Sequence, residues 1–458
     1  MRNASLCLYL LWATVVFSQT KKSAPASAAT SPMARICEDP YQVREPAEGW
    51  PEGPVRVLFH REKSKAPWSA NPSIRLPGLE AAAGVSAHTL VCVEESHLEM
   101  GQYDSGELGY APSWNVILVR LPDRKVYSVS RSLSGEMPPD IKWKKGSGVG
   151  KAPNEIFVRW MRLIVEQKVA RLKIRFRSKE YHTVSAMAFS GDGTKLAVAQ
   201  EPRSSSSGTP SPPITIFDLT TGQPGADMHA DYSTSSIALS RSGTMIATER
   251  YGHVEIWDAL SGRVTQKLET KDVGSLLFGT DDTLGVAGGE KAQVWDIGGN
   301  RILHSATGSQ VQLSPEGVWM AVSNTRAGIK VQELESGREL ASFPRVGERD
   351  KYFVSRDGRA MARDAALSAA MYVAGNPQGL SLELPNLAVN LLSALAPARD
   401  GFVIGNSDGI VGVVSGTAPK PRAFATGLMA IKTIAVSSDG KLVALGDSTG
   451  TIEIWELR

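Results

Sequence analysis

The sequence predicts an all-β fold in which seven small antiparallel sheets form a ring, preceded by a small β-rich domain with one helix. Two observations carry this prediction. A segment of about 40 residues recurs through the second half of the chain, and each copy contains short apolar runs separated by glycine-containing turns. In addition, one strand-like segment precedes the first copy, whereas the last copy lacks its final strand.

The repeat is most legible at the end of the chain. Its parts there are an apolar run at 433–436, Ser437-Ser438-Asp439-Gly440, a second run at 441–445, a turn at 446–450 and a third run at 451–456. Taking Trp455 as the marker, the equivalent positions are Phe217, Trp257, Trp295, Gln332, Val373, Val414 and Trp455. Seven markers predict seven copies, and the degenerate markers Gln332, Val373 and Val414 leave six or eight open.

Residues 171–177 alternate with a period of two. Leu172, Ile174 and Phe176 are expected on one face, and four cations on the other. Other copies have a fourth strand after the marker strand, but the chain ends before the last copy could supply one. We therefore expect this N-terminal strand to complete the last sheet and close the ring, with its cations protecting the outer edge.

Residues 171–458 resemble a divergent WD-repeat β-propeller. The resemblance rests on Phe217-Asp218, Trp257-Asp258, Trp295-Asp296 and Trp455-Glu456, with turns such as Ser190-Gly191-Asp192-Gly193 and Ser355-Arg356-Asp357-Gly358. It implies a seven-bladed propeller over residues 169–458. The Gly-His pair typical of the family is missing, since Gly252-His253 falls in a different turn.

The region before the repeats is similar to an uncharacterised module that precedes such propellers in other exported proteins. The residues that carry this similarity include 90–96, 101–103, Gly109-Tyr110 and 114–116. No activity is implied by it.

The N-terminus has the outline of a secretory signal peptide. Arg2 precedes an apolar stretch from Ala4 to Phe17, which is shorter than the roughly 20 residues that span a bilayer. We expect a signal peptide at 1–18, export to the periplasm or the outside of the cell, and no transmembrane segment after its removal; a permanent anchor is the weaker alternative. Residues 19–36 are rich in Ser, Ala and Pro and are expected to form a flexible linker.

Residues 37–168 are expected to form the small β-rich domain. Predicted strands lie at 55–60, 89–94, 114–121 and 125–129. A helix capped by Asn154 follows, with Ile156, Trp160, Leu163 and Ile164 on its packed face.

Two cysteines remain after the signal peptide, Cys37 and Cys92. In an oxidising compartment they could form a disulfide. Two buried free thiols are the alternative.

The sequence shows no catalytic, metal or cofactor signature of adequate specificity. The net charge of +3 does not indicate a nucleic acid partner. Gly405-Asn406-Ser407-Asp408-Gly409 matches a hydrolase nucleophile elbow but aligns with a hairpin turn, and the glycine-rich segment 146–151 lacks phosphate-loop spacing. The insertion at 201–213 is expected to be a solvated loop. The seven histidines show no metal-ligand spacing.

We therefore expect an exported, non-catalytic, monomeric scaffold that binds a protein partner. One alternative is a propeller enzyme of hydrolase, lactonase or dehydrogenase type with a site at the channel mouth. Another is a cell-envelope protein that binds glycan through Tyr103, Tyr110, Trp114 and Trp143, although these aromatics are more typical of core and loop packing.

Overall fold

The computed structural model describes most of the chain from Trp50 onward, together with one helix before it. The described residues are 32–38, 50–62, 64, 66–71, 74–82, 85–102, 108–121, 123–127, 131–134, 148–149, 151–166, 168–177, 182–202, 213–228, 234, 236–250, 252–270, 273–279, 283–288, 291–307, 311–314, 317–324, 328–344, 351–365, 368–381, 392–398, 401–415, 418–428 and 430–458. The expected signal peptide at 1–18, linker residues 19–31, Tyr103, Trp143 and the core of the 201–213 insertion lie outside them. So do Gly146, Ser147 and Gly150 of the glycine-rich segment 146–151. No helix within the described residues is long and apolar enough to cross a membrane.

The N-terminal domain is built on one sheet, with β1 (Val55–Arg61) parallel to β2 (Thr89–Gln102), and β3 (Leu108–Arg120) antiparallel to β2. Two short strands, β4 (Arg131–Ser134) and β5 (Gly148–Val149), pair with β3. Of the predicted strand at 125–129, the structure describes residues 125–127, where Val126 makes an isolated antiparallel bridge to Val119 of β3 after the turn at Arg124; residues 128 and 129 lie outside the described residues.

Helix α1 (Pro32–Glu38) packs on one face of this sheet. Ala34 and Cys37 join an apolar cluster with Leu58, Leu90 and other residues, and Cys37 is disulfide-bonded to Cys92 of β2. The expected flexible linker is therefore wrong for residues 32–36. Ala34 is buried in this cluster, Met33 and Ile36 are half-buried against it, and the disulfide at Cys37 holds the helix against the sheet.

Helix α2 (Asn154–Glu166) covers the opposite face. Its buried residues are Phe157, Trp160, Met161 and Ile164, whereas Ile156 and Leu163 are only partly buried. The packed face of α2 therefore differs from the predicted one by a rotation of part of a turn about the helix axis. A wide apolar stripe allows such a shift, because more than one set of residues has helical spacing.

Seven four-stranded sheets follow within the described part of the chain, and we number them 1 to 7 by their first strands. Sheets 1 to 3 are β7 (Thr183–Phe189), β8 (Lys195–Glu201), β9 (Ile214–Asp218) and β10 (Gln223–Met228); β11 (Ile237–Leu239), β12 (Met245–Arg250), β13 (His253–Asp258) and β14 (Arg263–Glu269); and β15 (Val273–Phe278), β16 (Thr283–Gly288), β17 (Lys291–Asp296) and β18 (Arg301–Thr307). Sheets 4 and 5 are β19 (Val311–Leu313), β20 (Trp319–Asn324), β21 (Gly328–Glu333) and β22 (Glu339–Phe343); and β23 (Lys351–Val354), β24 (Ala360–Ala365), β25 (Ser368–Val373) and β26 (Asn376–Ser381). Sheets 6 and 7 are β27 (Leu392–Pro397), β28 (Gly401–Asn406), β29 (Ile410–Ser415) and β30 (Ala418–Ala425); and β31 (Ile431–Val436), β32 (Leu442–Asp447), β33 (Thr451–Leu457) and β6 (Ala170–Arg177).

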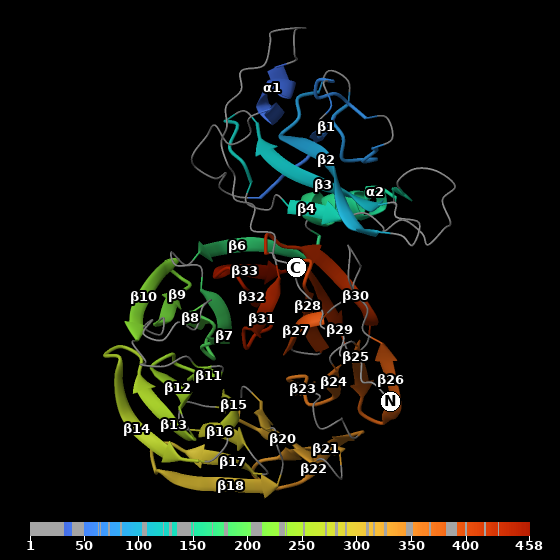
Figure 1. Ribbon diagram of the computed structural model, residues 1–458. Helices are drawn as coiled ribbons and strands as arrows, with labels where there is room; N and C mark the ends of the chain where they lie inside the picture. The colour runs from blue at the N-terminus through green and yellow to red at the C-terminus, as the bar shows by residue number, and fades with distance from the viewer. Residues whose placement is uncertain are drawn as a thin grey trace.

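The sheets follow one another around a circle, with the N-terminal domain beside sheets 6 and 7 (Figure 1). The first strands form the inner side: β7, β11, β15 and β19 contact one another in order, as do β23, β27, β31 and β7. Gln312 of β19 bridges to β23 by accepting a hydrogen bond from the backbone N of Val354. Each sheet thus packs against the next, and the last against the first.

The sequence markers share one structural feature. In sheets 2, 3, 4 and 7 the third and fourth strands shift register by one residue at the marker, where Trp257, Trp295, Gln332 and Trp455 lie. In sheets 5 and 6 the register shift lies beside Val373 and Val414. In sheet 1 the register shift lies just after Pro224, which is paired with Phe217. The markers are therefore equivalent in the fold even where the aromatic residue is lost.

Sheet 7 joins the two ends of the chain segment that contains the repeats. Strand β6 pairs antiparallel with β33, with Ile174 opposite Ile454 and Leu172 opposite Trp455. The expectation of one common face for Leu172, Ile174 and Phe176 is wrong: Leu172 packs against the core shared with the N-terminal domain, and the other two pack toward sheet 1. A bulge at Lys173 reverses the alternation, because one extra residue moves every later side chain to the opposite face.

Candidate functional site

The Ser-x-Asp-Gly turns hold one end of each sheet in a fixed shape. Five buried serines accept a hydrogen bond from the backbone N five residues later; they are Ser190, Ser240, Ser314, Ser355 and Ser437. The turn between the first two strands is also tied to the turn between the last two, as in Ala259 N to Thr244 O at 2.8 Å and Leu334 N to Val318 O at 2.9 Å. Both turns therefore lie at the same end of the sheet, which we call the turn end.

A central cavity of about 320 Å³ lies inside the circle of first strands. Its wall takes residues from β7, β11, β15, β19, β23, β27 and β31, so every sheet contributes. The described lining is mostly apolar, and Met187, Leu239, Phe353, Leu395 and Val436 are typical of it.

Two arginines line the cavity at the turn end. Arg241 and Arg356 both occupy the second position of a Ser-x-x-Gly turn, in sheets 2 and 5. They are the ionisable residues among the described lining residues. The side chain of Arg356 is fixed by a hydrogen bond from Nη2 to Val436 O, whereas Arg241 is exposed.

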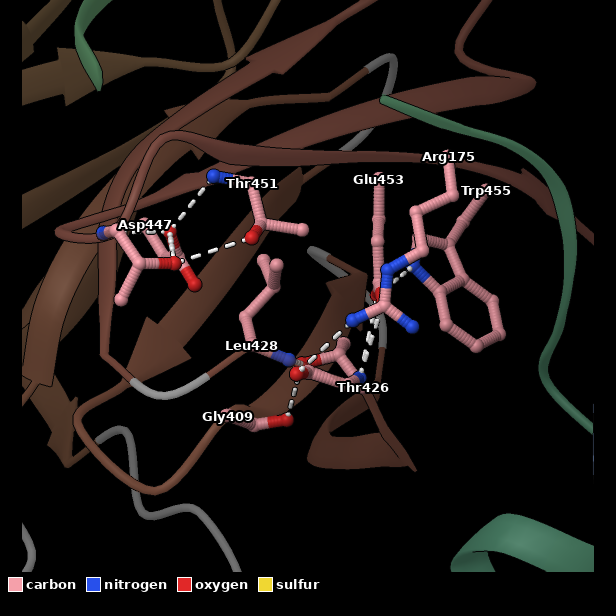
Figure 2. Close-up of polar contacts among 10 residues, drawn as sticks. Arg175, Gly409, Thr426, Leu428, Asp447, Thr451, Glu453 and Trp455 are labelled. Carbon is pink, nitrogen blue, oxygen red and sulfur yellow. Dashed lines mark hydrogen bonds and ion pairs between the residues drawn. The ribbon is translucent and has the colours of Figure 1, made fainter. Parts of the chain in front are cut away.

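A buried polar cluster lies where sheet 7 meets sheet 6 (Figure 2). Glu453 of β33 is fully buried and accepts hydrogen bonds from Trp455 Nε1 at 3.0 Å and from Gly427 N at 3.2 Å. Arg175 of β6 lies 3.4 Å from the same carboxylate and also donates to Gly427 O at 3.3 Å. The cluster therefore ties the third and fourth strands of sheet 7, β33 and β6, to the segment that follows β30.

The electrostatics of this cluster are dominated by burial. Loss of water contact raises the pKa of Glu453 above its usual value, while the charge of Arg175 and the hydrogen bonds from Trp455 and Gly427 oppose that rise. The predicted wet face of β6 thus holds for Arg171 and Lys173 but is wrong for Arg175, which the bulge turns inward.

Exposed apolar side chains concentrate on one part of the ring. Of seven large exposed hydrophobic residues among those described, six belong to sheets 2 to 4: Leu260, Val264, Ile302, Leu303, Val318 and Leu340. Leu260 is 89% exposed and the other five are 37% to 51% exposed. All six lie in the turns or the first residues of the fourth strand, so they share the turn end; we call this set the apolar rim.

The remaining sequence candidates occupy structural positions. Ser407 lies in the hairpin turn between β28 and β29, where Asn406 Oδ1 accepts hydrogen bonds from the backbone N of Asp408 and Ile410, so no strand-to-helix elbow is present there. Trp114 is buried and donates to Glu95, which removes it from any glycan-binding surface. Among the described residues, no group of three or more His, Cys, Asp or Glu could hold a metal ion.

Sequence reasoning missed three features: the two arginines at the cavity, the buried Glu453 and the apolar rim. Recurrence of Arg at the second position of the Ser-x-x-Gly turns was a usable signal for the two arginines. The apolar rim left a weaker signal, since single exposed apolar residues on edge strands are ordinary.

Comparison with known proteins shows that no family model matches the chain and that no curated protein is significantly similar to it.

Proposed function

We propose that the chain is an exported, non-catalytic protein-interaction scaffold built on a seven-bladed WD-repeat-like propeller, and that it acts as a monomer. Seven four-stranded sheets, contacts between successive first strands and the shared sheet 7 support this architecture. Support for export comes from the apolar stretch Ala4 to Phe17 and from the Cys37–Cys92 disulfide, since disulfides persist in oxidising compartments.

The observation that carries the proposal is the apolar rim. Monomeric soluble proteins rarely expose large groups of apolar side chains, and such groups commonly mark protein-interaction sites. Here six such residues share one end of three consecutive sheets, away from the N-terminal domain (Figure 1). A protein partner that covers them would remove their apolar surface from water, which is the main driving force for association.

The composition of the central cavity favours binding over acid–base catalysis. General acid–base chemistry needs a group that can gain and lose a proton near the working pH. The ionisable groups of the described lining are two arginines, whose guanidinium groups offer hydrogen-bond donors and no acceptor. We therefore favour the scaffold over the propeller enzyme.

The proposal is tested by affinity capture from the envelope fraction of the producing cell, using the full chain as bait. The double variant Leu260→Glu/Ile302→Glu places charge in the apolar rim. Val85→Glu is the matched control, because Val85 is also an exposed apolar residue, 49% exposed, but lies in the N-terminal domain.

We expect one partner to be recovered at stoichiometry with the unmodified chain and with Val85→Glu, and to be lost with the double variant. Recovery of the same proteins by all three baits would refute docking at the apolar rim. A stoichiometric metal or cofactor in the purified chain would instead favour the enzyme.

A further inference from the structure

The central cavity has the size of a small-ligand site. Its volume of about 320 Å³ lies at the lower end of the range of about 300 to 1,000 Å³ usual for ligand pockets. One water molecule takes up about 30 Å³ of the liquid, so the cavity volume corresponds to roughly ten non-hydrogen atoms of that size. That is the size of a short fatty acid or an aryl alkanoic acid.

The wall favours an apolar ligand body. Most of the described lining side chains are aliphatic or aromatic, including Phe189, Ile237, Leu313, Phe353 and Ile434. A water molecule in a protein interior needs two to four polar partners to be held well. Water is therefore held weakly against this wall, and an apolar body that displaces it gains the corresponding transfer free energy.

The charged side chains of the cavity wall lie at the turn end. Arg241 and Arg356 come from sheets 2 and 5, which are three steps apart on the circle, so they approach the cavity from different sides. Asp439 is near Arg356: burial acts to raise the pKa of Asp439, but hydrogen bonds from Ser437 and Lys441 and the charges of Lys441 and Arg356 lower it. The Asp439 side chain is 55% exposed, so water screens much of its charge.

Gly191, which has no side chain, leaves space for the Arg241 side chain. A Cβ atom on Gly191 would lie 2.7 Å from Arg241 Cγ and 2.8 Å from Arg241 Cα. Glycine at this turn position therefore lets the stem of Arg241 lie against the neighbouring turn of sheet 1. Asp192 N also donates to Arg241 O at 3.0 Å, which fixes the backbone from which the side chain extends.

We infer that the central cavity binds a small amphiphilic carboxylate, with its apolar body inside the circle of first strands and its carboxylate at the turn end against Arg241 and Arg356. The carboxylate replaces part of its hydration shell with charge-assisted hydrogen bonds from guanidinium groups, whose planar geometry suits a carboxylate. This site is separate from the apolar rim, and the inference does not depend on the proposed protein partner.

Calorimetric titration of the full chain with octanoate tests the inference, with octanol and octylamine as ligands of similar apolar length but different charge. We expect octanoate to bind at least about tenfold more tightly than octanol, since a hydrogen bond to a charged group contributes about 1.5 to 3 kcal/mol. Octylamine is expected not to bind. Equal binding of octanoate and octanol, or no octanoate binding at millimolar concentration, would overturn the inference.

The variant Arg241→Ala removes one of the two cations and is expected to weaken octanoate binding by about tenfold at low salt. Arg263→Ala is the matched control, because Arg263 is an exposed arginine of the same sheet, at the start of β14. Thermal unfolding checks that both variants fold. If Arg263→Ala weakens octanoate binding as much as Arg241→Ala does, the carboxylate is not at the turn-end cavity.

A protein segment with neighbouring apolar and acidic residues offers the same chemistry from another source. The blocked peptide acetyl-Asp-Leu-Phe-Glu-amide distinguishes the two. Binding of octanoate that the peptide does not displace supports the small carboxylate. Binding of the peptide without binding of octanoate assigns the arginines to a protein partner and overturns the inference.

Discussion

The indole ring of Trp50 meets that of Trp455 edge-on, with ring centroids 4.9 Å apart and planes inclined at 84°. Trp50 also donates from Nε1 to Ile164 O of α2 at 3.0 Å, and Trp455 packs against Phe424 of β30 with centroids 4.9 Å apart. One apolar cluster therefore runs from the N-terminal sheet through α2 into sheets 6 and 7. The two parts of the chain share a core.

This shared core predicts that the N-terminal domain and the ring unfold together. Trp50→Ala should lower the free energy of unfolding by about 3 to 5 kcal/mol, the usual cost of truncating a buried Trp. The measurement is urea unfolding followed by circular dichroism. Trp68→Ala is the control, since Trp68 is only partly buried and stacks on His60. An equal loss in both variants would contradict a special role for the Trp50–Trp455 contact.

Burial of Glu453 predicts a specific pH dependence. The pKa of Glu453 is raised on folding from an ordinary value near 4.5, so the stability that this group contributes is full below about pH 4.5 and is lost as the pH rises through the folded value. The variant Glu453→Gln cannot ionise and lacks this loss. Its free energy of unfolding, relative to that of the unmodified chain, should therefore increase as the pH rises above about 4.5.

Urea unfolding of the two proteins at a series of pH values checks this prediction. Glu339→Gln, which replaces an exposed carboxylate on β22 instead of the buried one, is the control. A difference between Glu453→Gln and the unmodified chain that is constant with pH, or that falls as the pH rises, would show that Glu453 ionises at least as easily in the folded chain as in the unfolded one.

The disulfide between Cys37 and Cys92 should stabilise the N-terminal domain. The bond closes a loop with a sequence separation of 55 residues. The chain-entropy estimate for a loop of that size is about 4 kcal/mol, although native-state enthalpy also contributes. Unfolding in the presence of dithiothreitol should occur at a lower urea concentration than without it. The double variant Cys37→Ser/Cys92→Ser, which has no bond to reduce, should be unaffected by dithiothreitol.

The repeated part of the fold was predictable because its signals are local. A buried serine that accepts a backbone hydrogen bond, a glycine with positive φ such as Gly440 and an apolar run each act within a few residues, and their recurrence sets the period. Even the degenerate marker Gln332 proved to be equivalent to Trp257 and Trp295.

The parts that could not be predicted depend on contacts between distant segments. Arg175 reads as an exposed cation in an alternating strand, and only the bulge at Lys173 turns it toward Glu453. Trp50 gives no local sign that it packs on Trp455, some 400 residues later in the chain. Arg241 and Arg356 become one site only because the sheets close around a common cavity.

The central claim is that both ends of the repeat region share sheet 7. Its most direct measurement is disulfide trapping of Arg171→Cys with Glu456→Cys, which are directly opposite each other on β6 and β33, followed by peptide mapping with mass spectrometry. The control pairs Arg171→Cys with Asp258→Cys, the position in sheet 2 that corresponds to Glu456. The shared sheet predicts a new disulfide in the first variant and none in the control. Absence of the 171–456 bond in a folded chain, or equal bonding in both variants, would contradict it.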